Sequence, residues 1–179
     1  HPGTYAGGAV LGAAGLVAGD ADTAVRLDGT NDRVEVPHAA AFNLTGTLTL
    51  EALVNVTGGS NFRAIVAKHD ASGDVPVYEF RIRASTGKLQ FVQKTTGGSF
   101  ITVISDATLQ TGTTYHVAVT KAGGTVTLFI DGQADVTRTV STSIASNTRP
   151  LTIGSRDGAK YLGGRIDEVA VYEHALSAA

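Results

Sequence analysis

The stretch that decides the fold is YHVAVTKAGGTVTLFIDGQA, residues 115–134. Apolar and polar side chains alternate on both sides of Ala122-Gly123-Gly124, which is the pattern of a strand, a tight turn and a second strand. The second strand has Val126, Leu128 and Ile130 on one face and ends at an Asp-Gly turn. We therefore expect an antiparallel β-hairpin here.

The same alternation recurs along the chain, broken by Gly, Asn and Asp clusters, and helical periodicity is nearly missing. It predicts a hairpin over TAVRLDGTNDRVEVP (residues 23–37), turning at 28–32. It also predicts strands over 47–56 and 62–68, two strands around 85–87, and two more within 151–173. Roughly a dozen short strands separated by turns indicate an all-β protein. We expect two antiparallel sheets packed as a β-sandwich.

The two ends of the chain have weaker patterns. Residues 1–20 are rich in Gly and Ala and are expected to form an edge strand plus irregular chain. HALSAA, residues 174–179, is short and rich in Ala, and is expected to form a single helical turn.

Composition limits the function classes. The 179 residues suit one well-buried domain, with 42% apolar and 17% charged residues. A net charge of -2 without a basic stripe argues against nucleic acid and against insertion into an anionic membrane. No apolar run approaches the roughly 18 residues of a membrane-spanning helix. Cysteine is absent, which excludes a disulfide framework and a thiolate metal site within the chain.

Three motifs resemble one family in their order and spacing. They are the 23–37 stretch, TGTTYHVAVTKAGGTVTLFIDGQ (111–133) and the terminal GGRIDEVAVYEHALSAA (163–179). They resemble the laminin-G-like jelly-roll domains of the concanavalin A-like lectin/glucanase superfamily, over nearly the whole chain. Tyr115 stands where this family often has Trp, on a packing position. The resemblance implies a single domain over 1–179, and we expect it to be a module of a larger extracellular protein, secreted or attached to the surface.

The resemblance also implies a structural calcium ion near the rim of the sandwich. Asp167 is the expected side-chain ligand, with the backbone of residues 3–5 as a further contributor, since calcium takes oxygen ligands. The alternative is that Asp167 accepts hydrogen bonds from backbone amides or pairs with Arg165. Asp167 and Glu168 are neighbours on a strand, so we expect their side chains to point to opposite faces.

Loops at the rim are the expected ligand surface, because strands provide a rigid scaffold for them. Asp70 and Asp74 lie in one loop, and Arg156, Asp157 and Tyr161 lie in another. The polar groups would bind sugar hydroxyls and Tyr161 would offer a ring face. For the loop with Asp70 and Asp74 the alternative is a solvated turn. The remaining aromatic residues of the strands are expected in the core: Phe62, Phe80, Phe91, Tyr115 and Phe129.

Catalysis is not expected. Retaining glucanases of the superfamily carry a strand-borne E-x-D-x-x-E, and this chain has none. Tyr78, Glu79, Arg81 and Arg83 alternate as on an exposed strand face, and His116 is expected to be packed or outward. Two functions stay open: a non-catalytic carbohydrate-binding module whose partner is a glycan or surface polysaccharide, and a structural or adhesive module of a surface fibre or virion appendage, which would contact other protein modules.

Overall fold

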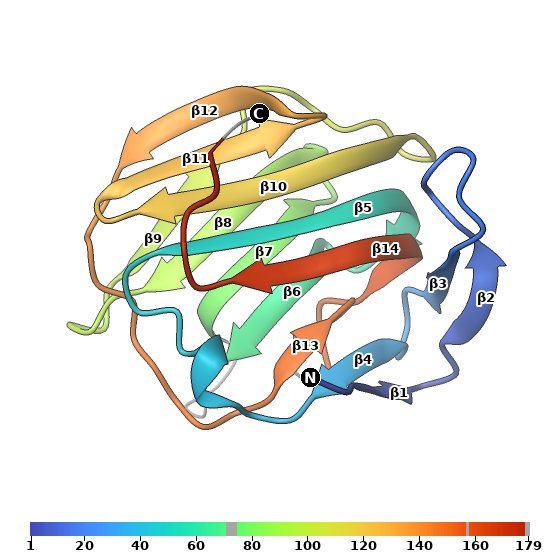
Figure 1. Cartoon of the computed structure of the whole chain (residues 1–179), viewed down its shortest axis with the longest axis horizontal. Coiled ribbons are helices and arrows are strands. Elements are labelled where there is room, and N and C mark those ends of the chain that lie inside the picture. The colour runs from blue at the N-terminus through green and yellow to red at the C-terminus, as the bar shows by residue number, and fades with distance from the viewer. Residues whose placement is uncertain (71–74, 157, 178–179) are drawn as a thin grey trace.

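A computed structural model describes residues 1–70, 75–156 and 158–177, which form two seven-stranded antiparallel sheets (Figure 1). The strands of sheet A lie in the order β1 (Thr4–Ala6), β4 (Arg33–Val36), β13 (Leu151–Ile153), β6 (Phe62–His69), β7 (Pro76–Arg83), β8 (Lys88–Lys94) and β9 (Phe100–Ile104). Those of sheet B lie in the order β12 (Gln133–Thr139), β11 (Thr125–Ile130), β10 (Thr114–Ala122), β5 (Leu48–Gly59), β14 (Leu162–Tyr172), β3 (Thr23–Asp28) and β2 (Val10–Ala14). The predicted two-sheet β-sandwich is confirmed.

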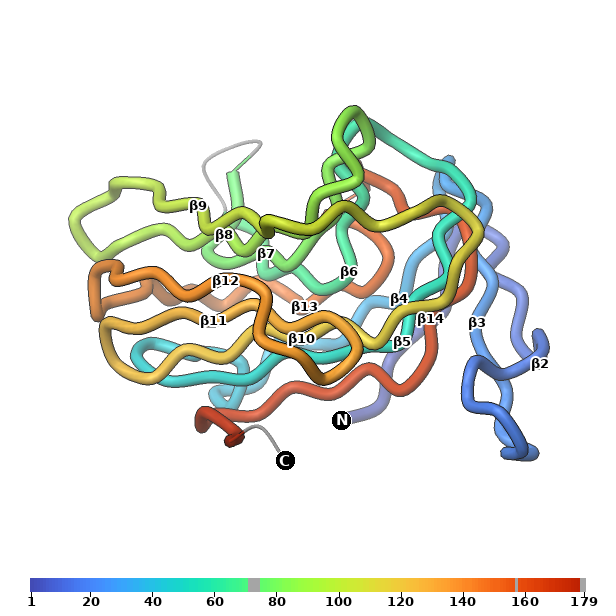
Figure 2. Tube along the Cα trace, turned by 90° about the horizontal axis from the view of Figure 1, so that it is seen from above, coloured from blue at the N-terminus to red at the C-terminus, as the bar shows by residue number. Residues whose placement is uncertain are grey.

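The two sheets lie one over the other, as Figure 2 shows, and the buried apolar side chains of the core come from both of them. In β5 the alternate residues Leu48, Leu50, Ala52 and Val54 are buried, and β10 follows the same period across the strand pair. This two-residue period is what a strand with one face on a core requires. The 115–134 hairpin is confirmed, with β10 and β11 paired around residues 122–125.

The predicted hairpin over residues 23–37 is wrong. β3 lies in sheet B and β4 lies in sheet A, so the segment between them is a corner that joins the two sheets. Asp32, which is 3% exposed, accepts a hydrogen bond from the backbone N–H of Asp28 (2.8 Å). The Asp28 carboxylate in turn accepts bonds from the N–H groups of Thr30 and Asn31. Asp and Asn satisfy backbone groups in a corner as well as in a hairpin turn, so the residue types did not distinguish the two.

A long connection over residues 140–150 carries the chain from sheet B back to sheet A. Two fully buried lysines hold its ends. Lys121 donates to the carbonyl of Ser141 (2.9 Å), and Lys68 donates to the carbonyl of Arg149 (2.7 Å). Burial lowers the pKa of the Lys68 ammonium from 10.5 to about 8, and it lowers the pKa of Lys121 as well.

The N-terminal strands agree with the prediction of an edge strand, since β1 and β2 lie at the edges of sheets A and B. The predicted helical turn at 174–179 is wrong for its described residues. Residues 173–177 cross the outer side of sheet B without helical structure, as the red segment in Figure 1 shows. The Thr49 hydroxyl donates to the carbonyl of His174 and accepts from the N–H of Leu176, and these bonds replace those of a helix.

The one helix in the described ranges is the three-residue 3₁₀ turn η1 (Ala40–Phe42). No helix in this part of the chain has the length and apolar character needed to cross a membrane.

Candidate functional site

The surface of sheet A that points away from sheet B, called the sheet A face below, carries an ordered set of polar side chains. Val34 and Val36 of β4 are both buried, so Glu35 between them points to the outer side of the sheet. The strand register continues this outward row across the sheet. Its members are Glu35, Thr152, Ala67, Glu79, Val92 and Thr102. A second outward row contains Ala64, Arg81, Gln90 and Ile104.

Glu79 is the centre of this face and is fully buried. Its Oε2 accepts hydrogen bonds from the guanidinium groups of Arg81 and Arg156, each at 2.9 Å. Its Oε1 has no hydrogen-bond partner within the part of the chain that the structure describes. A buried carboxylate is stable only when opposite charges and donors compensate its lost hydration, and here two arginines provide that compensation.

Arg81 is held on three sides. Besides its bond to Glu79, its Nε donates to the side-chain oxygen of Gln90 (2.9 Å), and its guanidinium lies 4.0 Å from the centre of the Phe62 ring. Burial lowers the pKa of Arg81, and the negative charge of Glu79 acts in the opposite direction. The result is a guanidinium in a fixed orientation, because carboxylate, amide and ring each restrict it.

A pocket of about 220 Å³ lies on the same face, near the ends of β4, β6 and β13. It is lined by Glu35, His69, Arg149, Pro150 and Thr152. Glu35 and Thr152 belong to the same outward row as Glu79, with only Ala67 between Thr152 and Glu79. This row therefore connects the pocket to the Glu79 network, although Thr152, Ala67 and Glu79 are themselves buried.

Of the five predicted ligand residues, Asp70 and Arg156 contact side chains of sheet A strands. Asp70 forms an ion pair with Lys94, which belongs to β8. Arg156 is buried and bonded to Glu79, so it supports the sheet A face and does not point into solvent as expected. Tyr161 is half-buried, and its N–H donates to the Ser60 hydroxyl (3.1 Å). Asp74 and Asp157 lie outside the described residues.

Sequence reasoning missed the Glu79 network. The alternation of residues 78–83 was interpreted as an ordinary exposed strand face, whereas Tyr78 donates to the carbonyl of Phe42 inside the core and Glu79 is buried. Phe62 and Phe129 were expected in the core, but both are only partly buried. A carboxylate two residues before an arginine on a strand was the available signal, because such residues share a face.

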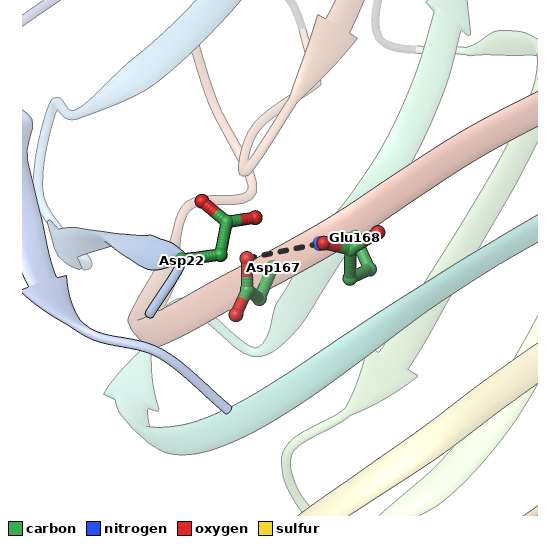
Figure 3. A group of neighbouring side chains, drawn as sticks. All are labelled: Asp22, Asp167 and Glu168. Atoms are coloured by element: carbon green, nitrogen blue, oxygen red, sulfur yellow. Dashed lines mark hydrogen bonds between the residues drawn. The ribbon is translucent and has the colours of Figure 1, made fainter. Parts of the chain in front are cut away.

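A second cluster brings three carboxylates together at the β14–β3 edge of the sandwich (Figure 3). One carboxylate oxygen from each of Asp22, Asp167 and Glu168 lies within 4.8 Å of the others. The expectation that Asp167 and Glu168 point to opposite faces is wrong. The register of β14 shifts between Asp167 and Ala170, and Glu168 has a φ of +47°, so a bulge turns both side chains to one side.

Hydrogen bonds already hold Asp167, which is 8% exposed. Its Oδ2 accepts from the N–H of Leu16 (2.8 Å) and its Oδ1 accepts from the N–H of Glu168 (3.1 Å). The amide-bonded alternative is therefore realised, whereas Arg165 donates instead to the carbonyl of Ala14.

The cluster fits a hard cation. Each carboxylate oxygen has a second lone pair, so the two amide bonds leave Asp167 able to act as a ligand. The pKa of the Glu168 carboxyl is raised, chiefly by a hydrogen bond with Asp22 and also by the nearby acidic charges. A cation would relieve this repulsion. Residues 3–5 are not near the cluster, because β1 pairs with β4 in sheet A.

Comparison with solved structures shows the same fold in several binding domains. Domain 4 of AbnA, an extracellular arabinanase from Geobacillus stearothermophilus solved with arabinotriose, is 17% identical with a TM-score of 0.75. That match covers 98% of this chain and 84% of the other. The CBM40 domain of the Ruminococcus gnavus IT-sialidase, bound to α2,3-sialyllactose, is 15% identical with a TM-score of 0.67, over 86% and 91% of the two chains.

The binding domain of Paraclostridial Mosquitocidal Protein 1 is 18% identical with a TM-score of 0.71. The match covers 95% of this chain but only 43% of that domain, so the chain spans less than half of it. No curated protein matches the sequence. Residues 28–179 match a family model, and they include the 111–133 hairpin and the terminal 163–179 motif. The chain belongs to the Laminin_G_3 family of the concanavalin A-like lectin/glucanases superfamily.

Proposed function

We propose that the protein is a non-catalytic carbohydrate-binding module that binds a glycan or surface polysaccharide through the sheet A face. The observation that carries the proposal is the fixed position of Arg81 between Glu79, Gln90 and the Phe62 ring. Sugars present many hydroxyl groups at fixed angles, and a donor that is already immobilised loses little entropy on binding them. Such preorganisation suits recognition of a polar ligand.

One partly exposed aromatic ring, Phe62, lies against this arginine, and a second, Tyr161, lies in a neighbouring loop. Phe62 begins β6, and Tyr161 lies in the loop whose backbone bonds to the start of that strand, through the Ala64 N–H and the Lys160 carbonyl (3.0 Å). Rings of this kind stack on the apolar face of a sugar. With few aromatic contacts we expect weak binding, on the order of millimolar to tens of micromolar.

The comparisons support the glycan class and leave the particular sugar open. Two of the similar domains were solved with arabinotriose and with α2,3-sialyllactose, and the first of them belongs to an extracellular enzyme. At 15–17% identity the likeness shows the fold, and the sheet A face supplies the rest of the argument. We place the module in a secreted or surface-attached protein.

The proposal includes a structural cation at Asp22, Asp167 and Glu168. Calcium is the expected ion, because it accepts several carboxylate and carbonyl oxygens in an irregular geometry. A bound calcium ion would attract the carboxylates of β14 and of the segment before β3 and so hold these two segments together. The residues themselves orient that contact already, since Asp167 accepts the N–H of Leu16.

The test is a glycan array probed with the wild type, Arg81→Lys and Arg138→Lys. Lysine at position 81 keeps the charge beside Glu79 but loses the planar fork of donors. Arg138 is an exposed arginine of sheet B and serves as the matched control. We expect Arg81→Lys alone to lose the glycan signal, and equal signals from all three proteins would contradict the proposal.

One observation favours the alternative of a structural or adhesive module. Four of the exposed large apolar residues lie near the N-terminus, namely Tyr5, Val10, Leu11 and Val17. Exposed apolar patches often mark contacts with other protein modules. If the wild type binds no glycan on the array at millimolar ligand, this second function becomes the better explanation.

A further inference from the structure

A second pocket lies on the opposite surface of the sandwich, the outer face of sheet B. Its volume is about 400 Å³, which is within the usual range for small-ligand sites. The strand register places Glu51, Ala118 and Phe129 in one outward row on β5, β10 and β11. Because Ala118 is small, the row has a depression between the carboxylate and the ring. Neighbouring strands are about 4.8 Å apart, so the depression is roughly 10 Å wide.

Glu51 forms one side of this pocket. Its carboxylate lies beside a phenol and an imidazole. The Tyr172 hydroxyl lies 3.2 Å from Glu51 Oε1, and His116 Nε2 lies 3.3 Å from Glu51 Oε2. The hydrogen bond to Glu51 raises the pKa of Tyr172, so the phenol stays protonated as a donor. Among the described residues neither Lys nor Arg forms an ion pair with Glu51. The carboxylate is thus oriented, partly exposed and without a strong cation.

The other side of the pocket is Phe129, whose side chain is partly exposed. Thr120 and Gln133 also line the pocket, and Leu176 and Ser177 of the C-terminal segment close one end. Apart from His116, which lies beside Glu51, the described lining residues include no basic side chain, and the Glu51 carboxylate lies across the pocket from an aromatic ring. A carboxylate attracts an ammonium group, and the face of an aromatic ring attracts the same group.

We propose that the sheet B pocket binds a primary amine carried on a sugar-sized ring. The ammonium lies between Glu51 and the Phe129 ring, above Ala118. Thr120 and Gln133 bond the hydroxyl groups of the ligand ring. A free amino sugar combines these features, and a flexible alkyl amine has only the charge. This site is separate from the sheet A face, so either proposal stands if the other fails.

The experiment compares three probes by NMR titration of the isotope-labelled full chain. Chitotriose has free amines, tri-N-acetylchitotriose has the same rings without the charge, and cadaverine has amines without a ring. We expect chitotriose to shift the signals of Glu51, Ala118 and Phe129 and to bind at least about tenfold more tightly than either control. Equal affinity for the acetylated sugar, or for cadaverine, would overturn the proposal.

Variants then separate the charge from the shape. Glu51→Gln removes the charge and should weaken chitotriose binding about tenfold, and Phe129→Leu should weaken it about fivefold. Ala118→Leu fills the depression and should abolish chitotriose binding without changing a charge. This variant therefore tests the site even if Glu51→Gln misfolds. Arg138→Lys, at an exposed arginine that does not line this pocket, should leave chitotriose binding unchanged. Unchanged affinity in folded Glu51→Gln or Ala118→Leu would contradict the site.

Discussion

The two outer faces of the sandwich each carry a glutamate in an outward row of strand residues, in opposite settings. Glu79 of sheet A is fully buried between Arg81 and Arg156, whereas Glu51 of sheet B is partly exposed beside a phenol and an imidazole. The backbone geometry is the same. A strand carboxylate that pairs with buried arginines holds their side chains in place, whereas one beside uncharged donors stays available to a ligand.

The largest difference between the two glutamates is expected in stability. Glu79→Gln leaves two arginines without their counter-charge in a buried position, and we expect a loss of about 3–5 kcal/mol in the free energy of unfolding. Glu51→Gln, the matched control on sheet B, should cost less than about 0.5 kcal/mol. Urea denaturation measures both. A loss below about 1 kcal/mol for Glu79→Gln would show that the buried network is not formed.

The next effect concerns the acidic cluster at the edge shared by β14 and β3. Calcium at 100 times its dissociation constant should stabilise the folded state by about 2.7 kcal/mol, if only that state binds it. A chelator should then lower the melting temperature of the wild type. The double variant Asp22→Asn/Glu168→Gln keeps the amide bonds of Asp167 and removes the other two charges, so its melting temperature should not respond to the chelator. If the melting temperature of the wild type does not respond to the chelator, the calcium site is wrong and Asp167 only accepts hydrogen bonds.

The third and smaller effect is a pH dependence of stability caused by the buried Lys68. The pKa of Lys68 is about 8 in the folded state and 10.5 for a lysine exposed to water. Between pH 8 and 10.5 the unfolded chain therefore binds more protons than the folded chain. The free energy of unfolding should therefore rise with pH, by about 2 kcal/mol from pH 7.5 to 9.5, and the stabilisation is absent below pH 8. Lys68→Met should flatten this rise, and Lys121→Met should reduce it by less. A stability that falls over the same interval would contradict the burial of the ammonium.

The smallest expected stability effect belongs to Tyr161, on the loop beside the sheet A face. Its ring is partly exposed, and its backbone N–H, not its ring, makes the bond to Ser60. Tyr161→Ala should weaken glycan binding while changing the free energy of unfolding by no more than about 0.5 kcal/mol. If the variant unfolds, the ring belongs to the core and does not serve as a sugar platform.

Sequence pattern was sufficient for the sheets and the core, because the two-residue period of β5 and β10 depends only on local backbone geometry. It was not sufficient where a turn joins strands. The 28–32 corner has the residues of a hairpin turn, yet β3 and β4 belong to different sheets. Which strands pair is decided by packing across the whole sandwich, and a turn sequence does not contain that information.

The candidate site was only partly predictable for a related reason. Arg156 was predicted as a ligand residue, but it is buried and bonded to Glu79, which is 77 positions away in sequence. Asp167 and Glu168 were separated by strict alternation, which the bulge at Glu168 overrides. Bulges and distant ion pairs depend on three-dimensional contacts, so a strand pattern predicts neither.

Binding of glycans to the sheet A face through Arg81 can be tested in solution. The most direct measurement is an NMR titration of the labelled chain with arabinotriose and with α2,3-sialyllactose at millimolar concentration. We expect at least one of them to shift the amide signals of β6, β7 and β8 and of residues 158–161, with no shift in the Arg81→Lys variant. Shifts confined to sheet B, or an unaltered response in Arg81→Lys, would contradict it.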